Sequence, residues 1–314
     1  MDFSGKILAS FKNTKLIYGV FGIVLCITAS MSFASIALAY NIVILTSKNA
    51  APYNSFIKEF KRVLPGSSIE VKNMDGDIDK GNTIINRANK DQADLIVALG
   101  SRAAWVARNE QEIPVMFSML SNPKKYDLDG RTGIRIGFSL RQQMQVFRTI
   151  MPNTETIGLL YSGNSKEEMK NIKERASEVG FKVIIKEVHD AREVASAVDG
   201  LLMNVDALWL RKDKIITGNA RLLKQVVLLR ALRKKIPIIG DNKWTVQNGA
   251  LFCLFTSYQS IGAQAGGMVE QLISKGEMGF KYPLDIDIFI NSNVAERLSP
   301  GVNVVVPRDA FIIK

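Results

Sequence analysis

The sequence predicts an α/β protein built from two doubly wound, parallel-sheet lobes. Short apolar runs alternate with segments of helical periodicity from Tyr40 almost to the C-terminus, a pattern typical of βαβ units. The alternation occurs in two sets of similar length, and the second set begins after Met151-Pro152-Asn153. A chain of 314 residues, 47% apolar and 23% charged, is long enough to form two such lobes.

The first set of elements runs from Tyr40 to Ile150. Strands are expected at Tyr40–Leu45, Ser68–Lys72, Asp94–Leu99, Ile113–Phe117 and Gly133–Phe138. Helices are expected at Pro52–Leu64, Asp79–Asn89, Ser101–Asn109 and from a capping box at Ser139 through Ile150. The apolar run DLIVAL is nearly continuous, as expected for a strand covered on both faces. A first crossing between lobes is expected within Ile134–Ser139.

The second set runs from Thr156 to Val306. Strands are expected at Thr156–Tyr161, Phe181–Glu187, Ala207–Leu210, Ile236–Ile239, Ala250–Phe255, Tyr282–Ile290 and Val302–Val306. Helices are expected from a capping box at Ser165 to Val179, and at Ala191–Met203, Thr217–Lys234, Asp241–Asn248 and Asn291–Leu298. Between them, the glycine- and alanine-rich segment after Thr256 predicts a helix that presses closely on its neighbours, at a return crossing between lobes.

The N-terminus predicts export. Lys6, Lys12 and Lys15 precede Leu16–Ala39, which contains no charge and ends in Ala37-Leu38-Ala39. This pattern is typical of a secretory signal peptide cleaved after Ala39, which would place the mature protein in the periplasm. The alternative is an uncleaved membrane anchor formed by residues 16–39. After cleavage one cysteine remains, Cys253 in an apolar strand, so we expect a buried thiol and no internal disulfide.

The charge balance is basic but dispersed. The formal net charge is +11, and removal of the leader leaves about +9. Because the cations form only short clusters, we interpret most of them as solvated helix faces and expect no nucleic acid partner. An acidic ligand, an anionic lipid or an acidic partner surface is a better use of the charge in an exported protein.

Candidate ligand-binding residues follow the predicted strands, because open α/β sheets bind ligands at the carboxyl ends of their strands. The positions combine hydroxyls, amides, helix-start N–H groups and cations, which suit a carboxylate or another small polar anion. Aromatic side chains there could stack on an apolar part of the ligand. Taken singly, a Ser or Asn at a helix start is more often a plain N-cap, so only their joint occurrence favours a site. The candidates are Ser47, Asn49, Gly100, Ser101, Arg102, Ser118, Tyr161, Asn164, Ser165, Arg211, Asp241, Trp244 and Thr256.

The sequence offers no catalytic pattern. His189, the one histidine, has no cysteine partner and no G-x-S-x-G elbow to serve, so we interpret it as a surface residue. No P-loop, G-x-G-x-x-G fingerprint or Cys/His cluster with metal spacing is present. We therefore expect no enzyme activity, no cofactor and no metal.

Six motifs resemble one family. They are DLIVALGSRAAW, IPVMFSMLSNP, IMPNTETIGLLYSGNS, DALWL, IPIIGDN and GALFCLFTSYQSIGAQAG. In this order and spacing, across Tyr40 to Pro307, they resemble the type I periplasmic substrate-binding proteins of ABC transporters, in the unassigned-substrate group that includes tryptophan- and tyrosine-type binders. The resemblance implies two Rossmann-like lobes joined by three hinge crossings, with ligand bound between them. The later crossings would lie at Thr256 and Tyr282–Asp287.

The resemblance also implies domain bounds and contacts. Lobe 1 would comprise 40–137 and 256–281, and lobe 2 would comprise 138–255 and 282–314, after a signal peptide at 1–39. The family's contacts, carried over by motif, fall on Ser47, Asn49, Gly100, Ser101, Ser118, Asn164, Ser165, Asp241 and Thr256. The chain departs from the family pattern at Lys48-Asn49-Ala50 and Ser101-Arg102, and it is unusually cationic at Arg211-Lys212. These departures favour a more acidic ligand than an aromatic amino acid.

Two functions follow as hypotheses. In the first, a monomer captures a small polar, anionic or amino-acid-like molecule and delivers it to an ABC permease. In the second, the liganded protein docks on a membrane signalling receptor without transport. A DNA-binding repressor of the same architecture is excluded, because an apolar leader occupies the place of its helix-turn-helix. Neither the ligand's identity nor the choice between transport and sensing follows from the sequence.

Overall fold

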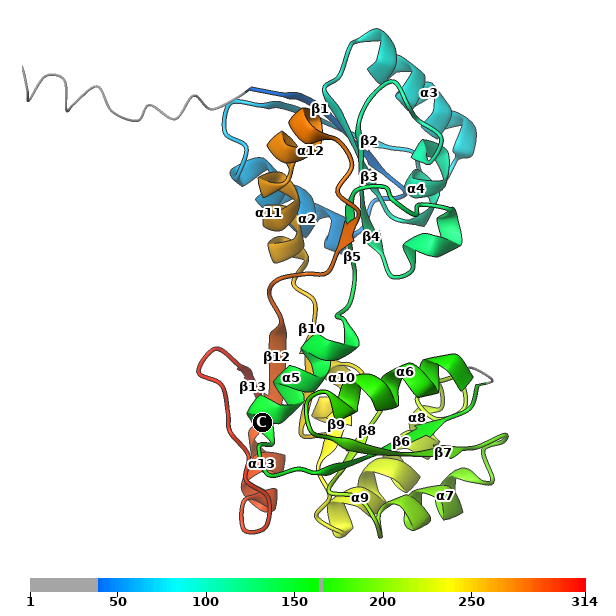
Figure 1. Ribbon diagram of the computed structural model, residues 1–314, viewed down its shortest axis with the longest axis vertical. Coiled ribbons are helices and arrows are strands. Elements are labelled where there is room, and N and C mark those ends of the chain that lie inside the picture. Colours follow the sequence, from blue (N-terminus) through cyan, green and yellow to red (C-terminus); the bar gives the residue numbers. More distant parts are fainter. Residues whose placement is uncertain (1–38, 164–165) are drawn as a thin grey trace, which may run out of the picture. The chain divides into compact units, whose positions relative to one another are not determined.

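The computed structural model describes residues 39–163 and 166–314, and within these ranges the strands form two sheets (Figure 1). The predicted leader, apart from Ala39, and the predicted capping box at Ser165 lie outside the described residues. The predicted α/β class, with two sets of parallel strands covered by helices, is confirmed.

The first sheet has six strands in the order β11-β5-β4-β3-β1-β2, and all of its pairs are parallel. Its strands are β1 (Asn41–Thr46), β2 (Ser68–Asn73), β3 (Leu95–Leu99), β4 (Val115–Leu120), β5 (Gly133–Arg135) and β11 (Phe280–Lys281). Its helices are α2 (Ala51–Arg62), α3 (Ile78–Lys90), α4 (Ser101–Ala107), α11 (Tyr258–Gly267) and α12 (Val269–Lys275), with a 3-10 turn η1 (Pro123–Tyr126).

Helices cover both faces of this sheet, which explains why β3 and β4 are buried along their whole length. On one face Phe56 and Phe60 of α2 and Ile261 of α11 pack against strand side chains such as Ile44. On the other face α3 and α4 contribute residues such as Ile85 to a second core. Alternate strand residues point to opposite faces, so a strand covered on both sides must be apolar throughout.

The second sheet has seven strands in the order β13-β12-β10-β9-β8-β6-β7, parallel except between β10 and β12. Its strands are β6 (Thr156–Tyr161), β7 (Lys182–Glu187), β8 (Ala207–Trp209), β9 (Ile238–Gly240), β10 (Phe252–Phe255), β12 (Asp287–Asn291) and β13 (Phe311–Ile313). Its helices are α5 (Leu140–Ile150), α6 (Lys166–Ser177), α7 (Val194–Leu201), α8 (Ala220–Leu222), η2 (Leu223–Leu228), α9 (Leu229–Arg233), α10 (Lys243–Gln247) and α13 (Ser292–Leu298).

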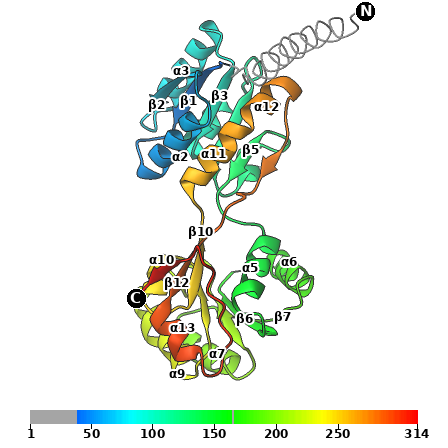
Figure 2. The same ribbon diagram turned by 90° about the vertical axis from the view of Figure 1, so that its left-hand side faces the viewer.

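This sheet also separates two cores. Helices α5 and α6 lie on one face and α7 and α9 on the other, as Figures 1 and 2 show. The predicted capping box of α5 is confirmed: the Ser139 hydroxyl accepts a hydrogen bond from the Gln142 amide, and the Gln142 side chain accepts one from the Ser139 amide. Cys253 is fully buried, and burial raises the pKa of its thiol to about 12.

Three sequence predictions need correction. The helix predicted at Thr217–Lys234 begins only at Ala220, after an Asn219 cap, and contains the six-residue π-helix η2. The strand predicted at Tyr282–Ile290 is limited to β12, because Pro283 has no amide to donate and the preceding residues connect to β11 of the other sheet. Val302–Val306 is not a strand: Val305 donates its amide to the Ile150 carbonyl at the end of α5, and the last strand is β13.

The return crossing brings a late segment onto the first sheet. The chain leaves β10 of the seven-stranded sheet, and α11 then lies beside α2, far away in sequence (Figures 1 and 2). A Cβ on Gly262 would come within 2.2 Å of the Phe56 carbonyl oxygen, and one on Gly266 within 2.2 Å of the Val63 side chain. The small residues therefore allow a close helix–helix contact in addition to the expected contact with the sheet.

We predict that Gly262→Ala destabilises the protein by about 1–3 kcal/mol, because the added methyl group meets backbone and must push α11 away from α2. The measurement is denaturant unfolding. The matched control is Gly267→Ala in the same helix, where a Cβ meets nothing within 4 Å. This control should be neutral or stabilising by about 0.5 kcal/mol. Equal effects of the two substitutions would contradict the close contact.

Candidate functional site

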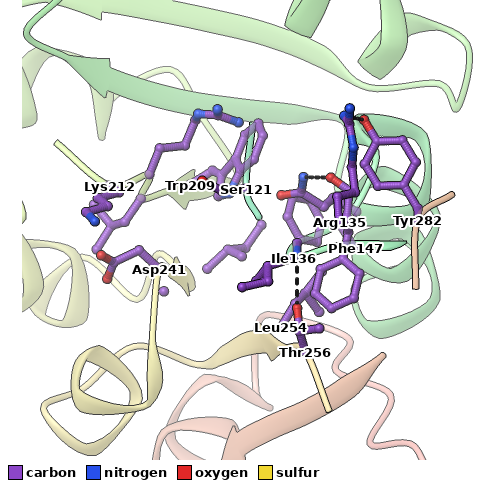
Figure 3. Close-up of a pocket in the computed structure, with 17 residues that line it drawn as sticks. Ser121, Arg135, Ile136, Phe147, Trp209, Lys212, Asp241, Leu254, Thr256 and Tyr282 are labelled. Atoms are coloured by element: carbon purple, nitrogen blue, oxygen red, sulfur yellow. Dashed lines mark hydrogen bonds between the residues drawn. The ribbon is translucent and has the colours of Figure 1, made fainter. Parts of the chain in front are cut away.

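A cavity of about 480 Å³ lies where the crossings meet the ends of strands of the seven-stranded sheet (Figure 3). We call it the crossing cavity. Its lining comes from the end of β4, from β5 and the crossing that follows, from α5, and from β8, β9, β10 and Tyr282. Its size suits a small metabolite, since ligand pockets usually measure about 300–1,000 Å³.

Three cations line the crossing cavity: Arg135, Arg211 and Lys212. The Arg135 guanidinium donates to the Tyr282 hydroxyl at 2.9 Å and lies 4.7 Å from the centre of its ring. Its Nε atom is buried and has no hydrogen-bond partner among the described residues. Arg211 is already engaged, because it forms a 2.5 Å ion pair with Glu168 and lies 5.0 Å from the centre of the Trp209 ring.

Asp241 supplies the one carboxylate among the lining residues. Burial raises the pKa of this carboxyl above its ordinary value, although hydrogen bonds from its own amide and from Asn242, Thr245 and Thr217 act in the opposite direction. The Asn242 side-chain amide donates to Oδ1 of Asp241 at 3.0 Å. A buried carboxylate whose charge is incompletely compensated is a good partner for a cation.

Aromatic and aliphatic side chains form the walls. The rings of Phe147 and Trp209 meet edge to face, with centroids 5.3 Å apart. Leu254 in β10 and Thr256 just after it also line the cavity. The Thr256 hydroxyl accepts a hydrogen bond from the Gly137 amide at 3.3 Å (Figure 3). Two crossings therefore meet at the cavity, and an apolar wall adjoins its charged groups.

Asp213 fixes the loop that presents Arg211 and Lys212. Its carboxylate accepts hydrogen bonds from the Ser162 amide at 2.7 Å and the Ser162 hydroxyl at 2.8 Å. It also accepts from the amides of Ile215 and Ile216, each at 2.9 Å. Burial alone would raise the pKa of this carboxyl, but these donors hold it below its ordinary value.

A second hollow lies at the carboxyl ends of β1 and β3, and its lining includes Ser47, Ser101 and Arg102. The Ser47 hydroxyl accepts hydrogen bonds from the amides of Arg102 and Ala103, at 3.1 and 2.9 Å, and thereby caps α4. The Arg102 guanidinium donates to the Gly76 carbonyl at 2.7 Å. Gly100 has a φ of 89°, and a Cβ there would come within 2.0 Å of the Tyr53 hydroxyl.

The structure thus divides the predicted residues. Arg211, Asp241 and Thr256 line the crossing cavity, whereas Ser47, Ser101 and Arg102 line the second hollow. Asn164 and Ser165 lie outside the described residues. The others lie elsewhere. Ser118 is fully buried, and its hydroxyl donates to the Ile134 carbonyl. Asn49 is exposed and accepts a hydrogen bond from Asn54. Tyr161 lies beside Glu187 and α6, and Trp244 is 40% exposed on α10.

Sequence reasoning missed several lining residues. Arg135 and Tyr282 belong to predicted crossings, but a strand-end rule does not select them. Lys212 and Trp209 lie in DALWLRKDK, whose positive charge predicts an acidic ligand but does not select either residue as a contact. Phe147 reads as an ordinary core residue of α5. The signal that could have identified Arg135 is a cation within an otherwise apolar crossing.

The described residues show neither a metal-binding cluster nor a helix that could span a membrane. No group of His, Cys, Asp and Glu side chains in that part of the chain is arranged to hold a metal ion. None of its helices is both long and apolar enough to cross a membrane. His189 is exposed, and its amide donates to Glu193.

Comparison with known proteins gives consistent similarities. Residues 57–307 match the family described as ABC transporter substrate binding protein. The chain is 25% identical over 262 residues to the tyrosine-binding protein of Clostridioides difficile (strain R20291), which covers 77% of this chain and 75% of that protein.

Solved structures share the fold. The ligand-free, open structure of a substrate-binding protein with adhesive properties from Clostridium difficile gives a TM-score of 0.69 at 22% identity, covering 88% of this chain and 99% of that one. A chain of the XylFII–LytSN complex gives a TM-score of 0.58 at 14% identity, covering 82% of this chain and 100% of that one.

We predict that Asp213→Ala lowers the free energy of unfolding by about 1–3 kcal/mol at neutral pH, because partly buried amides lose their acceptor. Since the folded pKa of Asp213 is lowered, its stabilisation is present above the unfolded pKa of about 4 and is lost as the pH falls through the folded value. The difference between variant and wild type should therefore shrink in acid. Urea unfolding at several pH values measures it, with exposed Asp129→Ala as the control. A difference that persists unchanged in acid would contradict the role of the charge.

Proposed function

Because the chain belongs to the ABC transporter substrate-binding protein family and has the type I periplasmic binding protein fold, we propose that it captures a small polar ligand and delivers it to an ABC permease. The lobes are residues 40–137 with 256–281, and 138–255 with 282–314. Residues 1–39 direct export to the periplasm and are removed after Ala39, and the protein acts as a monomer. Ligand binding draws the lobes together about the three crossings.

The charge arrangement in the crossing cavity carries this proposal. A desolvated carboxylate, Asp241, and the guanidinium group of Arg135 line one cavity with aromatic walls. An amino-acid-like ligand satisfies both, with its ammonium group on Asp241 and its carboxylate on Arg135. Lys212 adds a further positive charge, which favours an amino acid with an acidic side chain or another anionic ligand. The tyrosine-binding relative supports the amino acid class.

We infer that the second hollow supplies further contacts to the ligand. Ser101 begins α4, and its amide lies at a helix N-terminus that favours negative charge. Ser47 contributes indirectly, because its hydroxyl already caps that helix. Arg102 keeps one guanidinium nitrogen on the Gly76 carbonyl and offers its remaining N–H groups to the ligand.

The alternative is a sensing component that docks on a membrane receptor in its liganded form. The structural likeness to a chain solved within the XylFII–LytSN complex favours it as the second candidate. Adjacent permease and ATPase genes would favour transport, and an adjacent signalling gene would favour sensing. Neither role requires catalysis, so replacement of the exposed His189 should leave ligand affinity unchanged.

We predict that one or more amino acids in a panel of amino acids and small carboxylates raise the melting temperature of the protein. Asp241→Asn should weaken binding of that ligand about ten- to a hundred-fold, the scale of a lost charged hydrogen bond. The wild-type affinity should fall as the pH drops through the raised pKa of Asp241, because protonation removes the partner of the ammonium group. Thermal shift followed by isothermal titration provides the measurements.

The ligand-free variant provides an independent check. Because the folded pKa of Asp241 is raised, its ionisation opposes folding at higher pH, so Asp241→Asn should raise the ligand-free melting temperature near neutrality. Arg135→Gln tests the carboxylate contact, and exposed Asp129→Asn serves as the control. A panel in which no compound shifts the melting temperature would contradict ligand capture. Unchanged affinity in Asp241→Asn would contradict only the ammonium contact.

A further inference from the structure

The positive charge of the chain is concentrated in one segment of the second lobe. Between Arg211 and Lys235, nine cations and one acid give a net charge of +8, compared with about +9 for the whole chain after residue 39. No Asp or Glu occurs from Lys214 to Gly240. The cations of this acid-free stretch are Lys214, Arg221, Lys224, Arg230, Arg233, Lys234 and Lys235.

The helix α8–η2–α9 places Arg221, Lys224 and Arg233 at exposed positions, and Lys234 and Lys235, also exposed, follow directly after its end. Its buried residues recur at every fourth position, at Leu223, Val227 and Ala231. Its exposed positions follow the same spacing and are Arg221, Gln225, Leu229 and Arg233, with Lys224 exposed beside them. We call Arg221, Lys224, Arg233, Lys234 and Lys235 the basic ridge.

Acidic neighbours do not neutralise the basic ridge. Arg230 forms an ion pair with Asp199 of α7, but no ridge residue pairs with a carboxylate among the described residues. Helix α6 of the same lobe is different, because its lysines alternate with acidic residues and Lys170 pairs with Glu174. Like charges without partners repel one another in the free protein, so binding to an anionic surface relieves a cost already present.

We propose that the basic ridge docks the protein on an anionic lipid bilayer. Clusters of four to eight Lys and Arg residues bind anionic headgroups, each cation contributing several-fold to the affinity. The helix cannot insert as an interfacial amphipathic helix, because Leu223, Val227 and Leu228 already lie in the core. Binding is therefore electrostatic and superficial, with Leu229, which is 40% exposed, reaching the headgroup region.

A bilayer suits the ridge better than an acidic protein does. A protein interface usually combines charges of both signs, which fix the orientation of the two partners, but this stretch contains no acidic residue. Its long, flexible Lys and Arg side chains can instead bind lipid phosphates at variable positions. Docking of this kind holds an exported protein near a membrane without a covalent anchor. Vesicle binding needs no ligand in the crossing cavity, so this proposal stands or falls separately from the proposed function.

The test uses residues 40–314, because both sheets and their cores lie within this range. This range is also the product of the proposed cleavage after Ala39. Co-sedimentation is measured with phosphatidylcholine vesicles, with and without phosphatidylglycerol. We expect binding only when phosphatidylglycerol is present and a steep loss of binding as salt is raised. The triple variant Arg221→Gln, Lys224→Gln, Arg233→Gln should lose roughly a hundred-fold in apparent affinity, at about five-fold per cation.

The matched control removes three exposed lysines of α6: Lys166→Gln, Lys170→Gln, Lys173→Gln. It changes the net charge equally and should retain most of the binding. Circular dichroism and melting temperatures confirm that both variants fold. Absence of binding to the anionic vesicles, equal binding to both kinds of vesicle, or equal losses in the two triple variants would overturn the proposal.

Discussion

The close contact between α11 and α2 is the constraint on which the two-sheet architecture depends. Helices α11 and α12 close one apolar face of the first sheet, where Ile261 and Leu272 join Ile44 in a single core. The first sheet therefore cannot bury this face until the chain has passed through the whole second sheet as far as β10. Gly262 makes this possible, because any larger residue would meet the backbone of α2. Because the helices that complete the first sheet come after β10, the chain must cross between the sheets more than once. Bringing these distant segments together costs loop-closure entropy.

The crossings are held together by side chains that also border the site. Gln264 donates to the Tyr282 carbonyl and accepts from the Leu284 amide, at 3.1 Å in each case. The side chain of Gln142, in α5, donates to the carbonyl of Pro283, the residue after Tyr282, at 2.8 Å. One crossing is thus held by helices that cover different sheets. Because Tyr282 also accepts a hydrogen bond from Arg135, the residue that lines the crossing cavity is bonded directly to this crossing.

Sequence reasoning predicted most of the elements because each buried strand had to be apolar and each helix amphipathic. It failed where tertiary partners decide. Val302–Val306 has strand-like composition, yet it bonds to the end of α5, and no local pattern specifies that partner. The candidate site was predicted from strand ends, and three of the residues chosen in this way, Arg211, Asp241 and Thr256, line the crossing cavity. Arg135 and Phe147 were missed because their place in the cavity depends on where the crossings and α5 lie on the second sheet.

Two aspartates of the second lobe show why residue type alone does not define a site. Asp213 and Asp241 both follow short parallel strands, and burial disfavours the charge of each. Asp213 meets two consecutive amides and both donors of Ser162, so its charge is satisfied within the fold. At Asp241 burial outweighs the hydrogen bonds from its own amide and from three neighbouring side chains, and the pKa of its carboxyl is raised as a result. The fold therefore uses one carboxylate to shape a loop and leaves the other, with a raised pKa, in the lining of the crossing cavity, and perturbed carboxyls of this kind cluster at functional sites.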